Sequence, residues 1–218
     1  MFSGIVEEMG AIQMINKGLA GAKFSILASL ILEDLKVGDS VSVAGTCLTA
    51  SHVDEMHFSV DVSIETLNCT TLGTISVGTP VNLERAMKLN ARIGGHLVTG
   101  HVDGIGILRA REQDGNAVRL TVDVPEEIIR YCVPKGSITM DGISLTINAV
   151  SDRSIAVVII PHTAKVTTLG LKQIGDTVNL ESDLIGKYVE RLLQASGSVP
   201  AKPTPVIDRE YLQKRGLL

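Results

Sequence analysis

Short stretches of alternating apolar and polar residues recur along the chain. Residues 118–124 alternate between a valine or leucine and a polar residue, and residues 58–62 and 40–44 follow the same pattern. A period of two is typical of a strand with one buried face. Glycine-containing turns separate these stretches about every ten residues, the spacing of a closed barrel or a sandwich. The pattern therefore predicts a mainly β protein.

Three segments depart from this strand pattern. We expect a short helix over residues 125–133 and a counterpart over residues 29–37. A longer helix should begin near Asp183 and end before Gly197, because apolar residues recur there at helical spacing. It could pack on its own barrel or against copies of itself. Its apolar stripe consists of Leu184, Ile185, Tyr188, Val189, Leu192 and Leu193.

Four sequence blocks occur twice in the same order. Repetition at one fixed spacing is the signature of a duplicated unit, and this spacing is too long for a solenoid repeat. We expect two repeats over residues 1–95 and 96–182, a helix over 183–197 and a proline-marked tail over 198–218. The blocks are TTLG (Thr70–Gly73 and Thr167–Gly170), VNLE (Val81–Glu84 and Val178–Glu181), Gly45, Leu48 and Thr49 returning as Gly142, Leu145 and Thr146, and Phe2–Gly10 returning as Val98–Gly106.

Composition narrows the class of protein. Apolar residues make up 44% of the 218 residues, which excludes a wholly disordered chain, and the net charge of −4 offers no basic surface for nucleic acid or an anionic membrane. Cys47, Cys69 and Cys132 form neither a disulfide framework nor a CxxC pair. Residues 1–10 lack the basic flank of a signal peptide, and the apolar residues 24–32 are too few to span a bilayer. We expect a cytoplasmic protein that binds neither nucleic acid nor membrane.

His96 and His101 raise the question of a metal site. Residues five apart in a strand point to opposite faces, and the neighbouring Gly94, Gly95 and Gly100 disfavour a helix. No set of cysteines and carboxylates at ligand spacing completes a site, so we expect no metal. The glycines allow either a close approach to a flat ligand or simply turns, and the sequence leaves both open.

The two repeats differ where chemistry would matter. Either the copies drifted after duplication, or two nearly equal pockets became chemically unequal. From the residues alone, the chain is a duplicated β-domain that binds small molecules, with its reaction open. The second copy places His101, Lys135, Asp141, Ser144 and His162 where the first has Ile5, Gly38, Ala44, Cys47 and Glu65.

Six motifs in order resemble the riboflavin synthase family, from Met1 to about Leu193. The sequence departs from the family at Ala44, where asparagine is usual, and in a looser motif over residues 63–69. The motifs are MFSGIVEEMG (Met1–Gly10), AGTCLT (Ala44–Thr49), IGGHLVTGHVDG (Ile93–Gly104), MDGISLT (Met140–Thr146), IPHTAKVTTLG (Ile160–Gly170) and VNLESDLIGKYVERLL (Val178–Leu193).

The resemblance implies a fold and an activity. The fold is two tandem six-stranded Greek-key barrels followed by a C-terminal helix that builds a homotrimer. The activity is the dismutation of two 6,7-dimethyl-8-ribityllumazine molecules to riboflavin and 5-amino-6-ribitylaminouracil, with no cofactor. Each active site would pair the first barrel of one subunit with the second barrel of its neighbour, and association with lumazine synthase is a further expectation. The alternative is a non-catalytic lumazine- or flavin-binding antenna protein.

The resemblance also implies the site residues. The catalytic set is His101, Ser40, Cys47, Asp141 and Asp183, with His101 transferring protons and Ser40 and Cys47 polarising the substrate. Asp61 and Thr49 are candidates for ribityl hydroxyls. The first pocket comprises Gly4, Ile5, Val6, Cys47, Leu48, Thr49, Asp61, Val62, Ser63, Ile64, Glu65 and Thr66, with Gly100, His101 and Val102 between the barrels. The second comprises Lys135, Ser144, Leu145, Thr146, Ile160, Pro161, His162, Thr163, Ala164 and Lys165.

Overall fold

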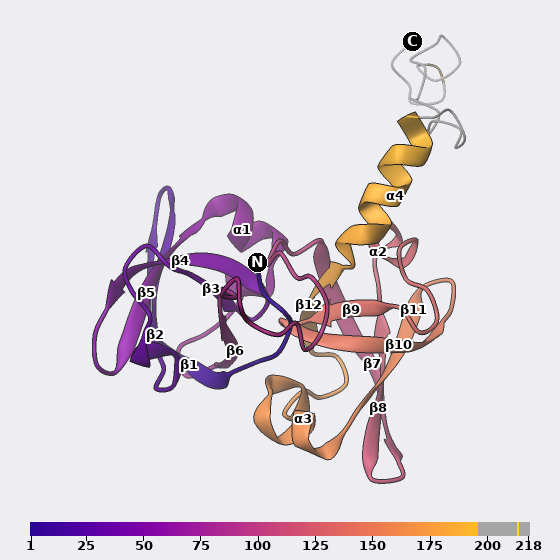
Figure 1. Cartoon of the computed structure of the whole chain (residues 1–218), viewed down its shortest axis with the longest axis horizontal. Coiled ribbons are helices and arrows are strands. Elements are labelled where there is room, and N and C mark those ends of the chain that lie inside the picture. The colour runs from indigo at the N-terminus through magenta and orange to yellow at the C-terminus, as the bar shows by residue number, and fades with distance from the viewer. Residues whose placement is uncertain (196–212, 214–218) are drawn as a thin grey trace. The chain divides into compact units, whose positions relative to one another are not determined.

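Two closed antiparallel barrels of six strands each make up most of the chain (Figure 1). The structure is a computed structural model that describes residues 1–195 and residue 213. The first barrel has the order β1-β2-β5-β4-β3-β6. Its strands are β1 (Glu8–Gly18), β2 (Gly21–Leu27), β3 (Ser40–Val43), β4 (Thr46–Val53), β5 (His57–Ser63) and β6 (Pro80–Arg85).

The second barrel repeats this order, read from the closed ring as β7-β8-β11-β10-β9-β12. The two copies therefore fold alike, and the predicted pair of six-stranded barrels is confirmed. Their strands occupy residues 8–85 and 104–182, while the exact domain boundaries remain a prediction. The second set is β7 (Gly104–Asp114), β8 (Ala117–Asp123), β9 (Ser137–Met140), β10 (Ile143–Val150), β11 (Ser154–Ile159) and β12 (Thr177–Ser182).

Strand alternation fills the two cores as the sequence predicts. Phe58, Val60 and Val62 of β5 are buried in the first core, and Leu120 and Val122 of β8 in the second. Alternation fails in β3, where Ser42 is buried although it points away from the core. Its hydroxyl oxygen would lie 3.3 Å from a Cβ atom on Gly142, so the second barrel covers it.

The predicted short helices are much shorter than expected. The segment 125–133 contains only one turn, α2 (Glu126–Ile129), and the segment 29–37 contains only a 3₁₀ turn at Ile31–Glu33. Each turn buries one isoleucine, Ile128 or Ile31, against its barrel. Leu35 and Cys132 are buried further along the same segments, so the apolar pattern reflects packing on the barrels without a full helix. Two further helices, α1 (Ile64–Cys69) and α3 (Pro161–Val166), follow β5 and β11 and precede 3₁₀ turns at Thr71–Gly73 and Thr168–Gly170.

The predicted C-terminal helix is present as α4 (Leu184–Ala195). The chain divides into two compact units, residues 1–184 and 185–218, so α4 is described by itself. Five of its stripe residues are exposed in the single chain: Ile185, Tyr188, Val189, Leu192 and Leu193. Gly197 and the predicted tail over 198–218, except residue 213, lie outside the described residues. Among the described residues, none of the helices has the length and apolar character needed to cross a membrane.

Candidate active site

Two glycine turns bring the barrels into contact. Gly45 lies between β3 and β4, and Gly142 lies at the equivalent turn between β9 and β10. Both have left-handed backbone angles, with φ of +83° and +82°. A Cβ atom on Gly45 would lie 2.6 Å from the backbone nitrogen of Gly142, so no other residue fits at this crossing. The repeated glycines thus set how closely the barrels approach.

The asparagines of the two VNLE motifs connect the barrels reciprocally. Asn82 donates to the carbonyl oxygen of Asp141 at 2.8 Å and accepts from the backbone N–H of Thr168 at 2.8 Å. Asn179 donates to the carbonyl oxygen of Ala44 at 2.8 Å and accepts from the N–H of Thr71 at 2.8 Å. These bonds satisfy buried backbone groups, so the Asn side chains position both inter-strand turns.

The glutamates of the same motifs hold the segments that precede each barrel. Glu84 accepts hydrogen bonds from the N–H and hydroxyl of Ser3 and from the N–H of Gly4, at 2.7, 2.8 and 3.1 Å. Glu181 accepts the equivalent three bonds from Thr99 and Gly100, at 2.7, 2.7 and 2.9 Å. Burial raises the pKa of Glu84, and these hydrogen bonds oppose that rise.

Each preceding segment then reaches across to the other barrel. The N–H of Ser144 donates to the carbonyl oxygen of Gly4, and the N–H of Cys47 donates to that of Gly100, both at 2.8 Å. Gly4 therefore lies against the second barrel and Gly100 against the first. The assignment of Gly4–Val6 to the first pocket stays a prediction, whereas this bond attaches Gly4 to the second barrel.

The predicted first-pocket residues gather on the outer face of the first barrel. Thr49 on β4 and Asp61 on β5 are exposed there, while Cys47 is half-buried. The hydroxyl of Ser63 caps α1 by accepting from the N–H of Thr66 at 3.1 Å, which fixes the start of the helix beside this face. Leu48 and Val62 lie in the core, so only their backbone could meet a ligand. The exposed His101 follows Gly100 and thus lies next to Cys47.

The second barrel presents an equivalent face with different chemistry. Thr146, Ile160, His162 and Lys165 are exposed, whereas Leu145 is in the core. Lys135 has a left-handed backbone with φ of 68°, where the first repeat uses Gly38 with φ of 96°. A lysine in this conformation is strained by about 1–3 kcal/mol, and such strain concentrates at functional positions.

His96 is a further candidate for the site, although the sequence suggested only a possible metal ligand. Its Nδ1 lies 2.7 Å from the hydroxyl oxygen of Ser144, and its Nε2 lies 3.2 Å from that of Thr139. Burial lowers the pKa of His96, and the negative charge of Asp183 opposes that shift. The charge of Asp183 thus acts on the histidine that contacts Ser144. In the sequence, His96 stands only two residues before the repeated block that begins at Val98.

The remaining predicted catalytic residues do not all converge. Asp141 is 2% exposed, and its carboxylate binds the N–H of Asn179 at 2.8 Å and the Nζ of Lys172 at 3.3 Å. Its carbonyl oxygen accepts from Asn82 of the first barrel, so Asp141 lies in the contact between the barrels. Burial raises the pKa of Asp141, while Lys172 opposes that rise. Ser40 pairs with Thr49 on the neighbouring strand.

Ser40 also lines a cavity of about 710 Å³ beside the first barrel. Ile5 is the only other predicted site residue in its lining, and neither Cys47 nor His101 reaches it. The wall carries Arg85, which is bound by Glu7 and Asp34. Thr49, Asp61, Thr146, His162 and Lys165 lie instead on the exposed outer faces of the two barrels.

Comparison with known proteins identifies the family. The family described as "Lumazine binding domain" matches residues 3–86 and 99–183. Riboflavin synthase of Actinobacillus pleuropneumoniae is 43% identical over 217 residues, covering 99% of this chain and 100% of that protein. The chain belongs to the riboflavin synthase family. The riboflavin synthase of Bacillus subtilis (strain 168) is 41% identical over 216 residues, again covering 99% of this chain and all of that protein.

Solved structures show the same fold in a second member of the lumazine-binding group. LumP complexed with 6,7-dimethyl-8-(1'-D-ribityl) lumazine has a TM-score of 0.76, and LumP complexed with riboflavin has a TM-score of 0.78. Both are 26% identical and cover 84% of this chain and 99% of that chain. The resemblance inferred from the six motifs is confirmed, and the chain is an enzyme of the riboflavin synthase family.

Proposed function

We propose that the chain catalyses the riboflavin synthase reaction. Two molecules of 6,7-dimethyl-8-ribityllumazine react, a four-carbon unit passes from one to the other, and the products are riboflavin and 5-amino-6-ribitylaminouracil. The atoms balance between two substrates and two products, so the equation requires no external oxidant or reductant. The observation that carries the proposal is the pair of equivalent faces, one per barrel, in a chain about 40% identical to riboflavin synthases.

Two equivalent faces suit a reaction between two identical substrates. Holding both molecules with their reacting carbons adjacent turns a bimolecular step into an effectively unimolecular one, which can supply roughly 7–11 kcal/mol in favourable cases. The C7 methyl of the lumazine is already acidic, because its carbanion delocalises into the ring. Modest acid–base assistance is then sufficient.

We assign roles on this basis. His101 transfers protons at the first pocket, because it is exposed and lies beside Cys47 through Gly100. Cys47 and Ser40 polarise the bound substrate, and Thr49 and Asp61 bind ribityl hydroxyls. In the second pocket, the Ser144 hydroxyl held by His96 takes the place of Cys47. Asp183 acts near this pocket through its charge on His96. Asp141 stabilises the contact between the barrels.

We further propose that the active site is shared between subunits of a homotrimer. Both faces are exposed in a single chain, and a reaction that excludes water needs them covered. The exposed apolar stripe of α4 would join the subunits. Association with lumazine synthase stays a prediction. A cytoplasmic location is also proposed, because Cys47, Cys69 and Cys132 are all free thiols.

The LumP structures favour one alternative, an antenna protein that binds the lumazine without turning it over. Incubation with 6,7-dimethyl-8-ribityllumazine alone separates the two functions. An enzyme forms riboflavin under these conditions, whereas an antenna protein shows ligand fluorescence changes and forms none.

A further inference from the structure

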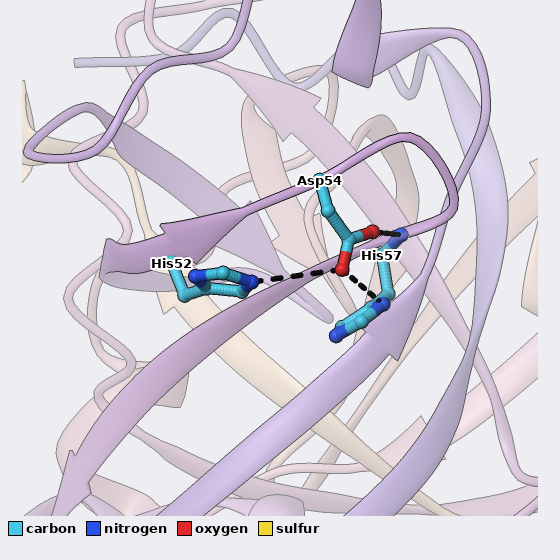
Figure 2. Close-up of side chains that lie close together, drawn as sticks. All are labelled: His52, Asp54 and His57. Atoms are coloured by element: carbon cyan, nitrogen blue, oxygen red, sulfur yellow. Dashed lines mark hydrogen bonds and ion pairs between the residues drawn. The ribbon is translucent and has the colours of Figure 1, made fainter.

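Two histidines and an aspartate meet at the turn that joins β4 and β5 (Figure 2). The Oδ2 atom of Asp54 lies 2.9 Å from Nδ1 of His57 and 3.6 Å from Nε2 of His52. One ligand atom from each of the three residues fits within a span of 4.8 Å. The imidazole rings lie 5.9 Å apart, and the carboxylate stands between them. From these contacts we propose that His52, Asp54 and His57 bind one divalent transition-metal ion of the Zn²⁺ class.

The distances suit such an ion. Ligand atoms that lie about 2.0–2.1 Å from a tetrahedral Zn²⁺ are separated by roughly 3.3 Å from one another. The two distances to Asp54 fall on either side of that value, so small side-chain rotations would admit the metal. Two imidazoles and one carboxylate form a donor set that favours Zn²⁺, Cu²⁺ and Ni²⁺ over Mg²⁺ and Ca²⁺. Three protein ligands leave a fourth position for water.

The carboxylate is already held in place for this purpose. The Oδ1 atom of Asp54 accepts hydrogen bonds from the N–H groups of Met56 and His57, both at 2.9 Å. This leaves Oδ2 to face the imidazoles. Hydrogen bonds that orient a ligating carboxylate are a regular feature of metal sites. A β-bulge between Ala50 and His52 sets the register of the strand that carries the other ligand.

The fold itself does not require these three residues. The equivalent turn of the second barrel has the same bulge, between Ile147 and Ala149, and the same closing bond, in which the N–H of Ser151 donates to the carbonyl oxygen of Ser154 at 2.8 Å. Ala149, Ser151 and Ser154 occupy the positions of His52, Asp54 and His57. The same turn therefore forms in the second barrel without these side chains, and only the first turn carries three possible metal ligands. The metal would connect the ends of β4 and β5 and stabilise the first barrel.

Zinc titration of the metal-free full-length chain, without an affinity tag, tests the proposal. We expect one Zn²⁺ per chain and a rise in Tm on binding, because a ligand that binds only the folded state stabilises it. Asp54→Asn keeps an oxygen that can accept the N–H groups of Met56 and His57 but removes the anionic ligand. His52→Ala removes an exposed imidazole. Each should weaken Zn²⁺ binding by at least about tenfold. Glu55→Gln, exposed on the same turn, is the matched control and should bind as the wild type does.

A triple variant keeps the test decisive if a single variant folds poorly. His52→Ala with Asp54→Ser and His57→Ser installs the residues that the second barrel already uses at this turn. It should lose the zinc-dependent rise in Tm, and bound Cu²⁺ should lose its two-imidazole signature in electron paramagnetic resonance. Equal zinc affinity in the triple variant, or no zinc binding by the folded wild type, would overturn the proposal. Turnover of the lumazine is measured on the same variants, so failure of the metal site and failure of the proposed function are separable.

Discussion

The backbone N–H of Cys47 donates to the carbonyl oxygen of Gly100, 2.8 Å away in the segment that precedes the other barrel. This bond brings His101, the next residue, beside Cys47. The repeat-equivalent position holds Ile5, so the fold does not need a histidine there. His101 belongs to the second copy, yet this contact brings it close enough to act in the reaction proposed at the first barrel.

Replacing His101 should abolish most turnover without affecting folding. His101→Ala removes an exposed imidazole, a side chain that serves as a general acid or base in many enzymes. Such groups contribute about 10²–10⁴ in rate, so kcat should fall by that factor while Tm stays constant. His52→Ala, also exposed but outside both pockets, is the control and should keep its rate. A wild-type kcat in His101→Ala would exclude the assigned role.

Lys135 should contribute to ligand binding rather than to stability. Lys135→Gly relieves the left-handed backbone strain but adds freedom to the unfolded chain, so the free energy of unfolding should change by no more than about 1 kcal/mol. Affinity for the lumazine, measured by fluorescence titration, should fall. Lys135→Met keeps the strained backbone and loses the charge, and it should lose affinity equally. Full affinity in both variants would remove Lys135 from the pocket.

Lys172 should stabilise the contact between the barrels by pairing with the buried carboxylate of Asp141. Lys172→Met leaves that charge uncompensated and should lower the free energy of unfolding by about 3 kcal/mol. The exposed Lys23→Met should change it by less than about 0.5 kcal/mol. Denaturant unfolding compares the two variants.

The pH dependence of the stability of Lys172→Met shows whether the uncompensated charge of Asp141 causes the loss. Burial raises the pKa of Asp141 above its usual 3.8, and loss of Lys172 removes a charge that opposes this rise. The folded state then binds a proton more readily than the unfolded state, so stability increases as pH falls through the raised pKa toward 3.8. The difference in the free energy of unfolding between wild type and the variant should therefore become smaller over that pH range. A deficit that stays constant there would point to lost packing instead.

The apolar stripe of α4 should hold the trimer. Burying a leucine or isoleucine is worth roughly 1.5–3 kcal/mol, and a carboxylate in that contact is costly. Ile185→Asp with Leu192→Asp should give folded monomers by light scattering, with reduced turnover at low protein concentration. Lys187→Asp with Gln194→Asp adds charge away from the stripe and should remain trimeric. A fully active monomer would contradict the shared active site.

Periodicity and repetition were enough to predict a duplicated β-domain, because Val81 and Leu83 fill the core through local alternation. They left a barrel and a sandwich open, and the resemblance to the family decided between the two. The polar half of the same motif could not be interpreted this way. Asn179 meets Thr71 from 108 residues away, and such a partner leaves no local pattern. Symmetry relates Gly4 to Gly100 but does not say which barrel each contacts, so their bonds to Ser144 and Cys47 could not be predicted. The contact of His96 with Ser144 could not be predicted either, because 48 residues separate the two in sequence.

The proposed reaction needs a single substrate, so one turnover assay decides whether the chain is a riboflavin synthase. The purified chain is incubated with 6,7-dimethyl-8-ribityllumazine alone, and both products are quantified by chromatography over time. We expect riboflavin and 5-amino-6-ribitylaminouracil in equal amounts, with two lumazine molecules consumed for each riboflavin formed. Binding of the lumazine by the folded chain without formation of riboflavin would contradict it.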